Sequence, residues 1–356
     1  MERTIQIGSR RIGGAEPTYF IADISANHDG DLERAKALIH LAAQAGADAA
    51  KFQNFRAAEI VSDYGFRALS DQISHQSTWK KSVFEVYQGA SVSWDWTPAL
   101  EAECEKASIE YFSTPYDLAA VDMLDPHVRV YKVGSGDITW MEMLDAVAAK
   151  GKPVILATGA SDLRDVTRAV DRLLAGNQDL VLMQCNTDYS ASLENFKHIH
   201  LNVLRTYRTM FPNVVLGLSD HTPGHATVLG AVALGARAVE KHFTDDNARV
   251  GPDHPFSMTP ASWRDMVDRT RELEHALGDP AKRVAANEQQ TVVIQRRCLR
   301  ASRALNAGER LDRSAVSALR PAPSDGIFPH ELDRVLGRTM RQDVTAGDYL
   351  RWTMFA

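Results

Sequence analysis

The sequence predicts a (β/α)8 barrel of the TIM type followed by a small β-rich domain. Three observations indicate this fold class. Short β-rich runs alternate with amphipathic helical stretches from residue 19 onward, Gly, Asp or Pro marks each return from helix to strand, and the pattern changes near residue 278. A doubly wound open sheet is the alternative, but no glycine-rich phosphate-binding motif follows the first strand.

The eight predicted strands follow one another in the chain. They span residues 19–25, 48–53, 110–115, 129–135, 153–159, 180–186, 214–220 and 238–244. Amphipathic segments separate them, for example DLERAKALIHLAAQAG after the first strand. Residues 54–96 break this rhythm with clustered aromatic and charged side chains, and we expect them to form a long loop or lid over the barrel mouth.

The C-terminal part of the chain has a different pattern. We expect a barrel domain over residues 1–277, a polar linker over 278–291 and a small β-rich domain over 292–356. Within the last, LNAGERL (305–311) and VTAGDYL (344–350) resemble each other and predict two equivalent tight turns. So small a domain buries a modest core, so we expect it to depend on a partner.

Composition narrows the class of protein. The chain is 44% hydrophobic and 24% charged, as is usual for a soluble globular protein. Its net charge of -6 and the lack of a basic block argue against a nucleic-acid partner. Three distant cysteines have no metal or redox spacing, no signal peptide is visible and no apolar run could span a membrane. We expect a cytoplasmic protein with no membrane partner.

Polar side chains recur where the predicted strands end, which is where TIM barrels place their active sites. Lys51 and Lys132 follow apolar strand residues, and we expect them to converge above the barrel centre. Two cations with nearby hydroxyl groups form a site for a phosphate or a carboxylate. Any single position is explained equally well by helix capping or by a lysine that reaches solvent, but the whole set is not.

Two histidines predict a metal site. His221 and His242 end the seventh and eighth strands, so neutral imidazoles there can share one divalent ion, with His28 or Glu240 in support. Water and substrate oxygens would complete the coordination, and such an open site serves as a Lewis acid that polarises a carbonyl. The alternative is that each histidine only hydrogen-bonds locally.

These motifs resemble those of the sialic acid synthases, which condense phosphoenolpyruvate with an N-acetylated sugar aldehyde. The resemblance covers nearly the whole chain and lies in ADISANHDGDLERAK, GADAAKFQNF, FSTPYD, YKVGSGDIT, GKPVILATGAS, GLSDHTPG, VEKHFTDD and GPDHPFS. The tail, with RCLRAS, AGERL and LRPAPSDGI, resembles the antifreeze-like (SAF, β-clip) domain of that family.

The resemblance implies roles for individual residues. His221 and His242 match the metal ligands, and the expected ion is manganese, with magnesium and cobalt also open. The positions that match phosphoenolpyruvate-binding residues are Lys51, Thr114, Lys132, Ser135 and Ser219. Those expected to bind the sugar are Thr187, Tyr189 and Asp253, and those expected to be catalytic are Asp23, Glu240 and His242. Arg320 matches an arginine that one subunit inserts into the active site of the other, which implies a domain-swapped homodimer.

The chain also departs from the family pattern. Asp23 stands where the family has a glutamate that contacts the sugar, and Ala157 replaces a serine in the phosphate region. Around Asn186 and Thr187 the usual order of the two residue types is reversed, and the turn RPAPSDG is longer than in the family. These changes leave the histidines and lysines in place but alter the sugar pocket.

We therefore predict a nonulosonic acid synthase that joins phosphoenolpyruvate to an open-chain N-acetylmannosamine-type sugar and releases phosphate by C–O cleavage. Legionaminic or pseudaminic acid synthesis from a diacetamido-trideoxyhexose is the alternative. An unphosphorylated sugar is favoured, because no second phosphate clamp stands out. Two further hypotheses are a Schiff-base aldolase that uses Lys51 or Lys132, and a catalytically inactive sugar-binding protein.

Overall fold

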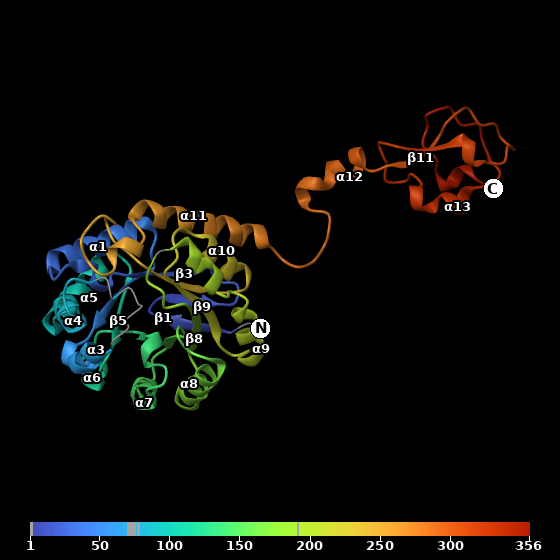
Figure 1. Cartoon of the computed structure of the whole chain (residues 1–356). Helices are drawn as coiled ribbons and strands as arrows, with labels where there is room; N and C mark the ends of the chain where they lie inside the picture. Colours follow the sequence, from blue (N-terminus) through green and yellow to red (C-terminus); the bar gives the residue numbers. More distant parts are fainter. Residues whose placement is uncertain (1–2, 70–75, 77–78, 191) are drawn as a thin grey trace. The chain divides into compact units, whose positions relative to one another are not determined.

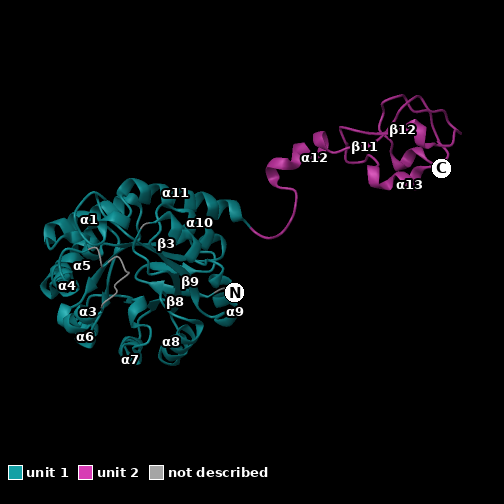
Figure 2. Cartoon of the chain, viewed as in Figure 1, with its two compact units in different colours: residues 1–278 teal, residues 279–356 magenta. Residues whose placement is uncertain are grey.

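The computed structural model describes residues 3–69, 76, 79–190 and 192–356. The chain divides into two compact units, Met1–Gly278 and Asp279–Ala356 (Figure 2). Each unit has a hydrophobic cluster of its own. No helix in the described part of the chain combines the length and the apolar character that crossing a membrane requires.

Eight strands of the first unit form one parallel sheet (Figure 1). Their order in the sheet is β5-β4-β3-β10-β9-β8-β7-β6, and the outer strands β5 and β6 lie beside each other, so the sheet closes almost completely into a barrel. The strands are β3 (Tyr19–Asp23), β4 (Ala49–Asn54), β5 (Glu110–Pro115), β6 (Tyr131–Val133), β7 (Val154–Ala157), β8 (Leu180–Cys185), β9 (Val215–Asp220) and β10 (Ala238–His242). Each overlaps a predicted strand, and the predicted fold class is confirmed.

Helices surround this barrel and bury one face each against it (Figure 1). In α8 (Leu163–Gly176), the Asp162 side chain accepts hydrogen bonds from the first turn, and Val166, Val170 and Leu173 are buried at helical spacing. The other helices around the barrel are α1 (Leu32–Ala45), α5 (Thr97–Lys106), α6 (Leu118–Leu124), α7 (Met141–Ala149), α9 (Val203–Met210), α10 (Ala226–Ala233) and α11 (Pro260–Leu277).

The prediction that residues 54–96 form a long loop was wrong, whereas their predicted place over the barrel mouth is confirmed, since Ile60 and Tyr87 line a cavity there. Short helices occupy much of this segment, namely α2 (Ala57–Ile60), α3 (Asp63–Ala68) and α4 (Val83–Ala90), although residues 70–75 and 77–78 lie outside the described part. Local capping explains two of them: the Ser62 side chain caps α3, and the Ser82 and Glu85 side chains form a reciprocal capping box at the start of α4. Helices this short are hard to recognise from apolar periodicity, because they offer one or two turns of pattern.

An N-terminal hairpin closes the opposite end of the barrel and was not predicted. Strands β1 (Thr4–Ile7) and β2 (Arg10–Gly13) pair antiparallel, and Ile5, Ile7 and Ile12 are buried. Gly13 has φ +104° and packs so closely on Val215, the first residue of β9, that a Cβ there would clash with its side chain. The carboxyl ends of the strands are therefore left for the functional site.

The second unit is a small β-rich fold. It contains α12 (Gln289–Gln295), the antiparallel strands β11 (Cys298–Ala301) and β12 (Val316–Leu319), and α13 (Leu332–Val335). The two predicted equivalent turns are confirmed, since Gly308 (φ +82°) and Gly347 (φ +87°) occupy corresponding positions. Reciprocal backbone hydrogen bonds of 2.9 Å join Leu305 and Val344, at the start of each turn.

Candidate active site

A cavity of about 490 Å³ lies at the carboxyl ends of the barrel strands. Most of the predicted site residues line it, as the sequence indicated. They are Asp23, Lys51, Thr114, Lys132, Ser135, Thr187, Tyr189, Ser219, His221, Glu240 and His242. Asp253 lines an adjoining pocket together with Tyr189 and His242, and Arg320 belongs to the second unit. Ala157 also lines the cavity, where a serine hydroxyl would otherwise face the ligand.

The first predicted cation is paired with a carboxylate at the cavity floor. Lys51 Nζ lies 2.6 Å from Asp23 Oδ2, and Gln53 Nε2 donates to the same oxygen at 3.1 Å. Both charged side chains are almost completely buried. Burial lowers the pKa of Lys51, but Asp23 and Glu240 outweigh that effect and raise this pKa above its ordinary value. Lys51 is therefore a fixed positive charge.

The second cation converges on the same place. Lys132 Nζ lies 2.7 Å from both carboxylate oxygens of Glu240, and Lys51 Nζ lies 3.8 Å from Glu240 Oε1. Burial and the Lys51 charge lower the pKa of Lys132, although Glu240 acts in the opposite sense. Burial raises the pKa of Glu240, but Lys132 and Lys51 bring it down to about 2. The lysines thus meet as predicted, with an ionised carboxylate between them.

The two predicted metal ligands face each other. The ring centres of His221 and His242 lie 5.3 Å apart, close to the ~5 Å expected for two imidazoles that bind one ion through ~2.1 Å bonds. His221 Nδ1 pairs with the Asn186 carbonyl at 2.8 Å, so Nε2 is the ring nitrogen that would bind an ion. Burial and the neighbouring His242 lower the pKa of His221 to about 4, so the ring is neutral near pH 7.

The surroundings of the histidines fit a metal site with open positions. His242 Nδ1 is buried without a hydrogen-bond partner among the described residues. In the same part of the chain, no group of three or more His, Cys, Asp or Glu side chains is arranged to hold an ion, so water and substrate would supply the remaining ligands. Of the two residues predicted as alternatives to support the histidines, Glu240 lines the cavity, whereas His28 does not and its Nδ1 accepts from Gly30 N.

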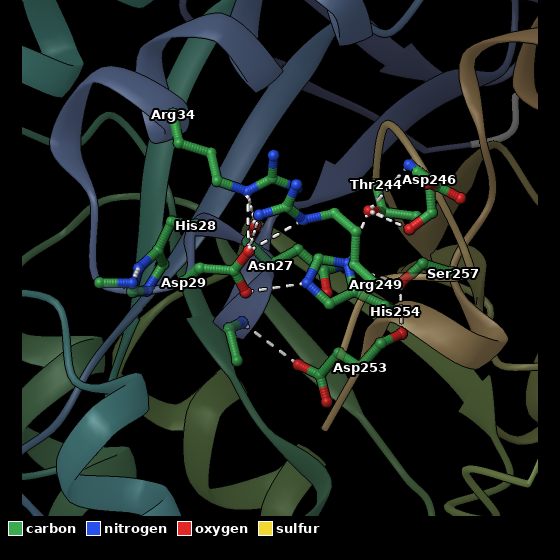
Figure 3. A network of polar contacts seen from close by, with 12 residues as sticks. Asn27, His28, Asp29, Arg34, Thr244, Asp246, Arg249, Asp253, His254 and Ser257 are labelled. Atoms are coloured by element: carbon green, nitrogen blue, oxygen red, sulfur yellow. Dashed lines mark hydrogen bonds and ion pairs between the residues drawn. The ribbon is translucent and has the colours of Figure 1, made fainter. Parts of the chain in front are cut away.

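The loop after β10 holds Asp253 in place (Figure 3). Asp253 Oδ2 accepts hydrogen bonds from Ser25 Oγ at 2.5 Å and from Ala26 N at 3.2 Å. The next residue, His254, is completely buried and pairs with Asp29 through Nε2 at 2.9 Å. One carboxylate edge of Asp253 is thereby fixed at the cavity rim, where it can accept a hydrogen bond from a ligand hydroxyl.

Several residues of the cavity were given no role by the sequence, among them Gln53, Tyr116 and Asp137. All three stand at strand exits, since Tyr116 directly follows β5, and this is the signal by which they could have been assigned. Asp137 Oδ2 is buried without a hydrogen-bond partner in the described part of the chain. Burial raises the pKa of this carboxyl to about 6.

The raised pKa of Asp137 makes stability depend on pH. Because the folded state retains this proton more tightly than the unfolded state, stability is lost as the pH rises from about 4 to 6. We expect Asp137→Asn to be more stable than the unsubstituted chain by up to about 3 kcal/mol at pH 8, but by only about 1 kcal/mol at pH 4.5. Urea unfolding at both pH values measures this. The exposed Asp171→Asn variant is the control, and an equal difference at both pH values would contradict the assignment.

A barrel with polar groups gathered at the carboxyl ends of its strands defines the class of TIM-barrel enzymes. The NeuB family model matches residues 38–282, and the SAF domain model matches residues 296–356. The chain therefore belongs to the NeuB family, the sialic acid synthases, and carries a C-terminal SAF domain, as the sequence resemblance predicted.

Similar proteins cover most of the chain. It is 32% identical to N,N'-diacetyllegionaminic acid synthase of Campylobacter jejuni, over 94% of this chain and 99% of that one. It is also 32% identical to human N-acetylneuraminate-9-phosphate synthase, over 77% and 75%. The solved structure of N-acetylneuraminic acid synthetase from Leptospira borgpetersenii, in complex with citrate, matches with a TM-score of 0.72 and 28% identity, over 82% of this chain and 96% of that one.

Proposed function

We propose that this protein is a nonulosonic acid synthase that condenses phosphoenolpyruvate with the open-chain form of an N-acetylmannosamine-type sugar. One observation carries the proposal: Lys51 and Lys132 meet around Glu240 at the floor of a cavity that His221 and His242 also line. The two lysines would bind the trianionic phosphoenolpyruvate, and the two imidazoles beside them would lie next to the aldehyde group of the sugar.

The cavity residues divide between the two substrates. Lys51, Lys132 and the hydroxyl groups of Thr114, Ser135 and Ser219 hold the phosphate and carboxylate of phosphoenolpyruvate, which orients C3 towards the aldehyde carbon. Thr114 Oγ1 is buried with no partner among the described residues, which suits a donor that awaits an anion. Tyr189 and Asp253 bind the sugar at the rim, while Asp23 orients Lys51 from below.

Bond making and bond breaking balance as follows. C3 of phosphoenolpyruvate forms a bond to the aldehyde carbon while the C=O π bond of the aldehyde breaks, and the aldehyde oxygen takes a proton from solvent to become a hydroxyl group. C2 of phosphoenolpyruvate becomes an oxocarbenium ion, to which water adds. Glu240, which its lysine neighbours keep ionised, takes a proton from that water. Loss of inorganic phosphate by C–O cleavage then leaves the ketone. A divalent ion held by His221 and His242, manganese in the first instance, would supply Lewis-acid polarisation of the aldehyde oxygen.

A second copy of the chain would complete the site. Lys51 and Lys132 are the only Lys or Arg side chains in the described cavity lining, and Asp23 and Glu240 already offset both. Bound phosphoenolpyruvate adds further negative charge beside the sugar, so a cation that enters the site together with the sugar would stabilise the complex of the enzyme with both substrates. Residues 279–356 carry more Lys and Arg than Asp and Glu, and Arg320 is exposed within them. We assign Arg320 to the active site of the partner subunit in a domain-swapped homodimer.

The route of the oxygen atoms tests the chemistry. In water labelled with ¹⁸O, the released phosphate is expected to remain unlabelled, because water attacks C2 rather than phosphorus. With phosphoenolpyruvate labelled at the bridging oxygen, the label is expected in the phosphate. Mass spectrometry of the phosphate reads both. Solvent label in the phosphate would contradict the mechanism, and trapping of a Lys132 adduct by borohydride would instead support the Schiff-base alternative.

The cavity wall bears on the choice of sugar. In the adjoining pocket, Asp253 faces a wall that includes Phe55, Ile60, Val86 and Tyr87, and no Lys or Arg side chain lines the described part of that pocket. This supports an unphosphorylated sugar, and it also favours the alternative substrate, a diacetamido-trideoxyhexose with a methyl group at C6. Mass spectrometry of the products from a panel of such sugars with phosphoenolpyruvate and Mn²⁺ decides among them.

A further inference from the structure

One buried ion pair has no part in the chemistry proposed above. In the described part of the chain, three lysines are almost completely buried against carboxylates. Two of them, Lys51 and Lys132, line the cavity, whereas Lys241 and its partner Asp220 are absent from the lining. The side chains of this last pair are the most completely buried, at 1% and 0% exposure. Substrate therefore does not account for this pair.

The pair lies on the outer face of the barrel wall, directly behind the two histidines. Side chains alternate between the two faces of a strand, so His221 and His242 point into the cavity while the residues before them point outward. Lys241 is the register partner of Asp220 in the parallel β9–β10 pair. The two metal ligands thus follow directly, on both strands, after the two members of the ion pair.

Hydrogen bonds extend the ion pair along the backbone on either side of His221. Lys241 Nζ donates to Asp220 Oδ2 and, at 2.6 Å, to the carbonyl oxygen of Thr222. Thr222 N donates to Asp220 Oδ1 at 3.3 Å, and Thr227 of α10 donates to Oδ2 at 2.8 Å. The residues before and after His221 are therefore both tied to the residue that precedes His242.

Stability alone does not explain such a pair. Removing two charges from water costs about as much as their attraction returns, so a well-packed apolar pair often serves a fold equally well. The better-attested use of a buried ion pair is to specify register. Here the register of β9 against β10 decides how far apart the two imidazoles lie.

We propose that Asp220 and Lys241 are positioning residues that fix the separation of the His221 and His242 rings and thereby set the affinity of this pair for a divalent cation. The inference rests on the proposed metal site. It predicts that substitution of the ion pair weakens metal binding while the fold and the anion site persist. The anion site persists because Lys51 and Lys132 are held by separate partners, Asp23 and Glu240.

The test is the affinity of the full-length protein for Mn²⁺, measured by electron paramagnetic resonance of the free ion. The double variant Asp220→Asn/Lys241→Met removes both charges, retains an acceptor for Thr222 and Thr227, and is expected to bind Mn²⁺ at least about tenfold more weakly. Its affinity for phosphoenolpyruvate without metal, measured by calorimetry, is expected to stay within about twofold of the wild-type value. The phosphate and carboxylate groups of phosphoenolpyruvate would bind to Lys51 and Lys132, which neither substitution contacts.

A matched control separates positioning from general destabilisation. Leu173→Ala opens a cavity in α8, away from the histidines, and is expected to lower the thermal stability without changing Mn²⁺ affinity. Should the double variant not fold, Thr227→Val removes one hydrogen bond to Asp220 and is expected to weaken Mn²⁺ binding about threefold. A folded variant of either kind with wild-type Mn²⁺ affinity overturns the inference. Absence of Mn²⁺ binding by the unsubstituted chain overturns the metal site itself, and this inference with it.

Discussion

A chain that ends at Gly278 is expected to fold and to lose nearly all of its synthase activity. The barrel has its own hydrophobic core, and all residues that line the cavity lie within it. Without Arg320, however, the cavity would lack the cation that the proposed dimer supplies. We expect the rate of phosphate release from phosphoenolpyruvate to fall by about 10²- to 10³-fold, the effect of removing a charge-stabilising donor from an active site. Circular dichroism and thermal unfolding verify that the truncated barrel is folded.

Point variants of the full chain localise this effect. Arg320→Ala is expected to raise KM for the sugar far more than KM for phosphoenolpyruvate, whereas the exposed Arg341→Ala in the same unit leaves both unchanged. Mixing the impaired Arg320→Ala chains with the impaired Lys132→Met chains after dissociation is expected to restore part of the lost activity. In such a mixed dimer, one intact barrel would receive one intact arginine. A mixture without this gain would place Arg320 in its own subunit's site, and a truncated barrel with unchanged kinetics would remove it from the site altogether.

Lys132→Met is expected to lower kcat/KM for phosphoenolpyruvate by about 10²- to 10⁴-fold, the usual result of truncating one member of a buried charge pair. Lys132 contacts both oxygens of Glu240, and the remaining cation, Lys51, lies 3.8 Å from Oε1. The substitution removes a positive charge from the proposed anion site. It also removes the main charge that lowers the pKa of Glu240, so the acidic limb of the pH profile of kcat is expected to move to higher pH.

Steady-state kinetics between pH 5 and pH 9 measure both effects. Lys106→Met is the matched control, because Lys106 forms a surface pair with Glu103 and is 67% exposed. It is expected to change kcat/KM by less than about twofold. Nearly normal use of phosphoenolpyruvate by Lys132→Met would contradict the anion site, and would leave the lysine with a structural role towards Glu240.

Much of the barrel could be predicted from the sequence because a parallel strand buried on both faces is a continuous apolar run. β8 and β9 are buried at every position, and each lies in a predicted strand. The N-terminal hairpin was missed because its strands contain four residues each and two of those in β2 are exposed arginines. The short helices α3 and α4 were missed because capping, rather than apolar periodicity, defines them.

The sequence by itself determined which residue types stand at the strand ends, and therefore that two lysines and two histidines would meet at one mouth. Only the tertiary structure decided which of them touch. Lys132 and Glu240 are 108 positions apart, and Asp23 meets Lys51 because β3 and β4 are neighbours in the closed barrel. Alternation along a strand is a local property that a sequence records, whereas contacts across the barrel depend on how the strands are staggered on closure, which no short stretch of the chain encodes.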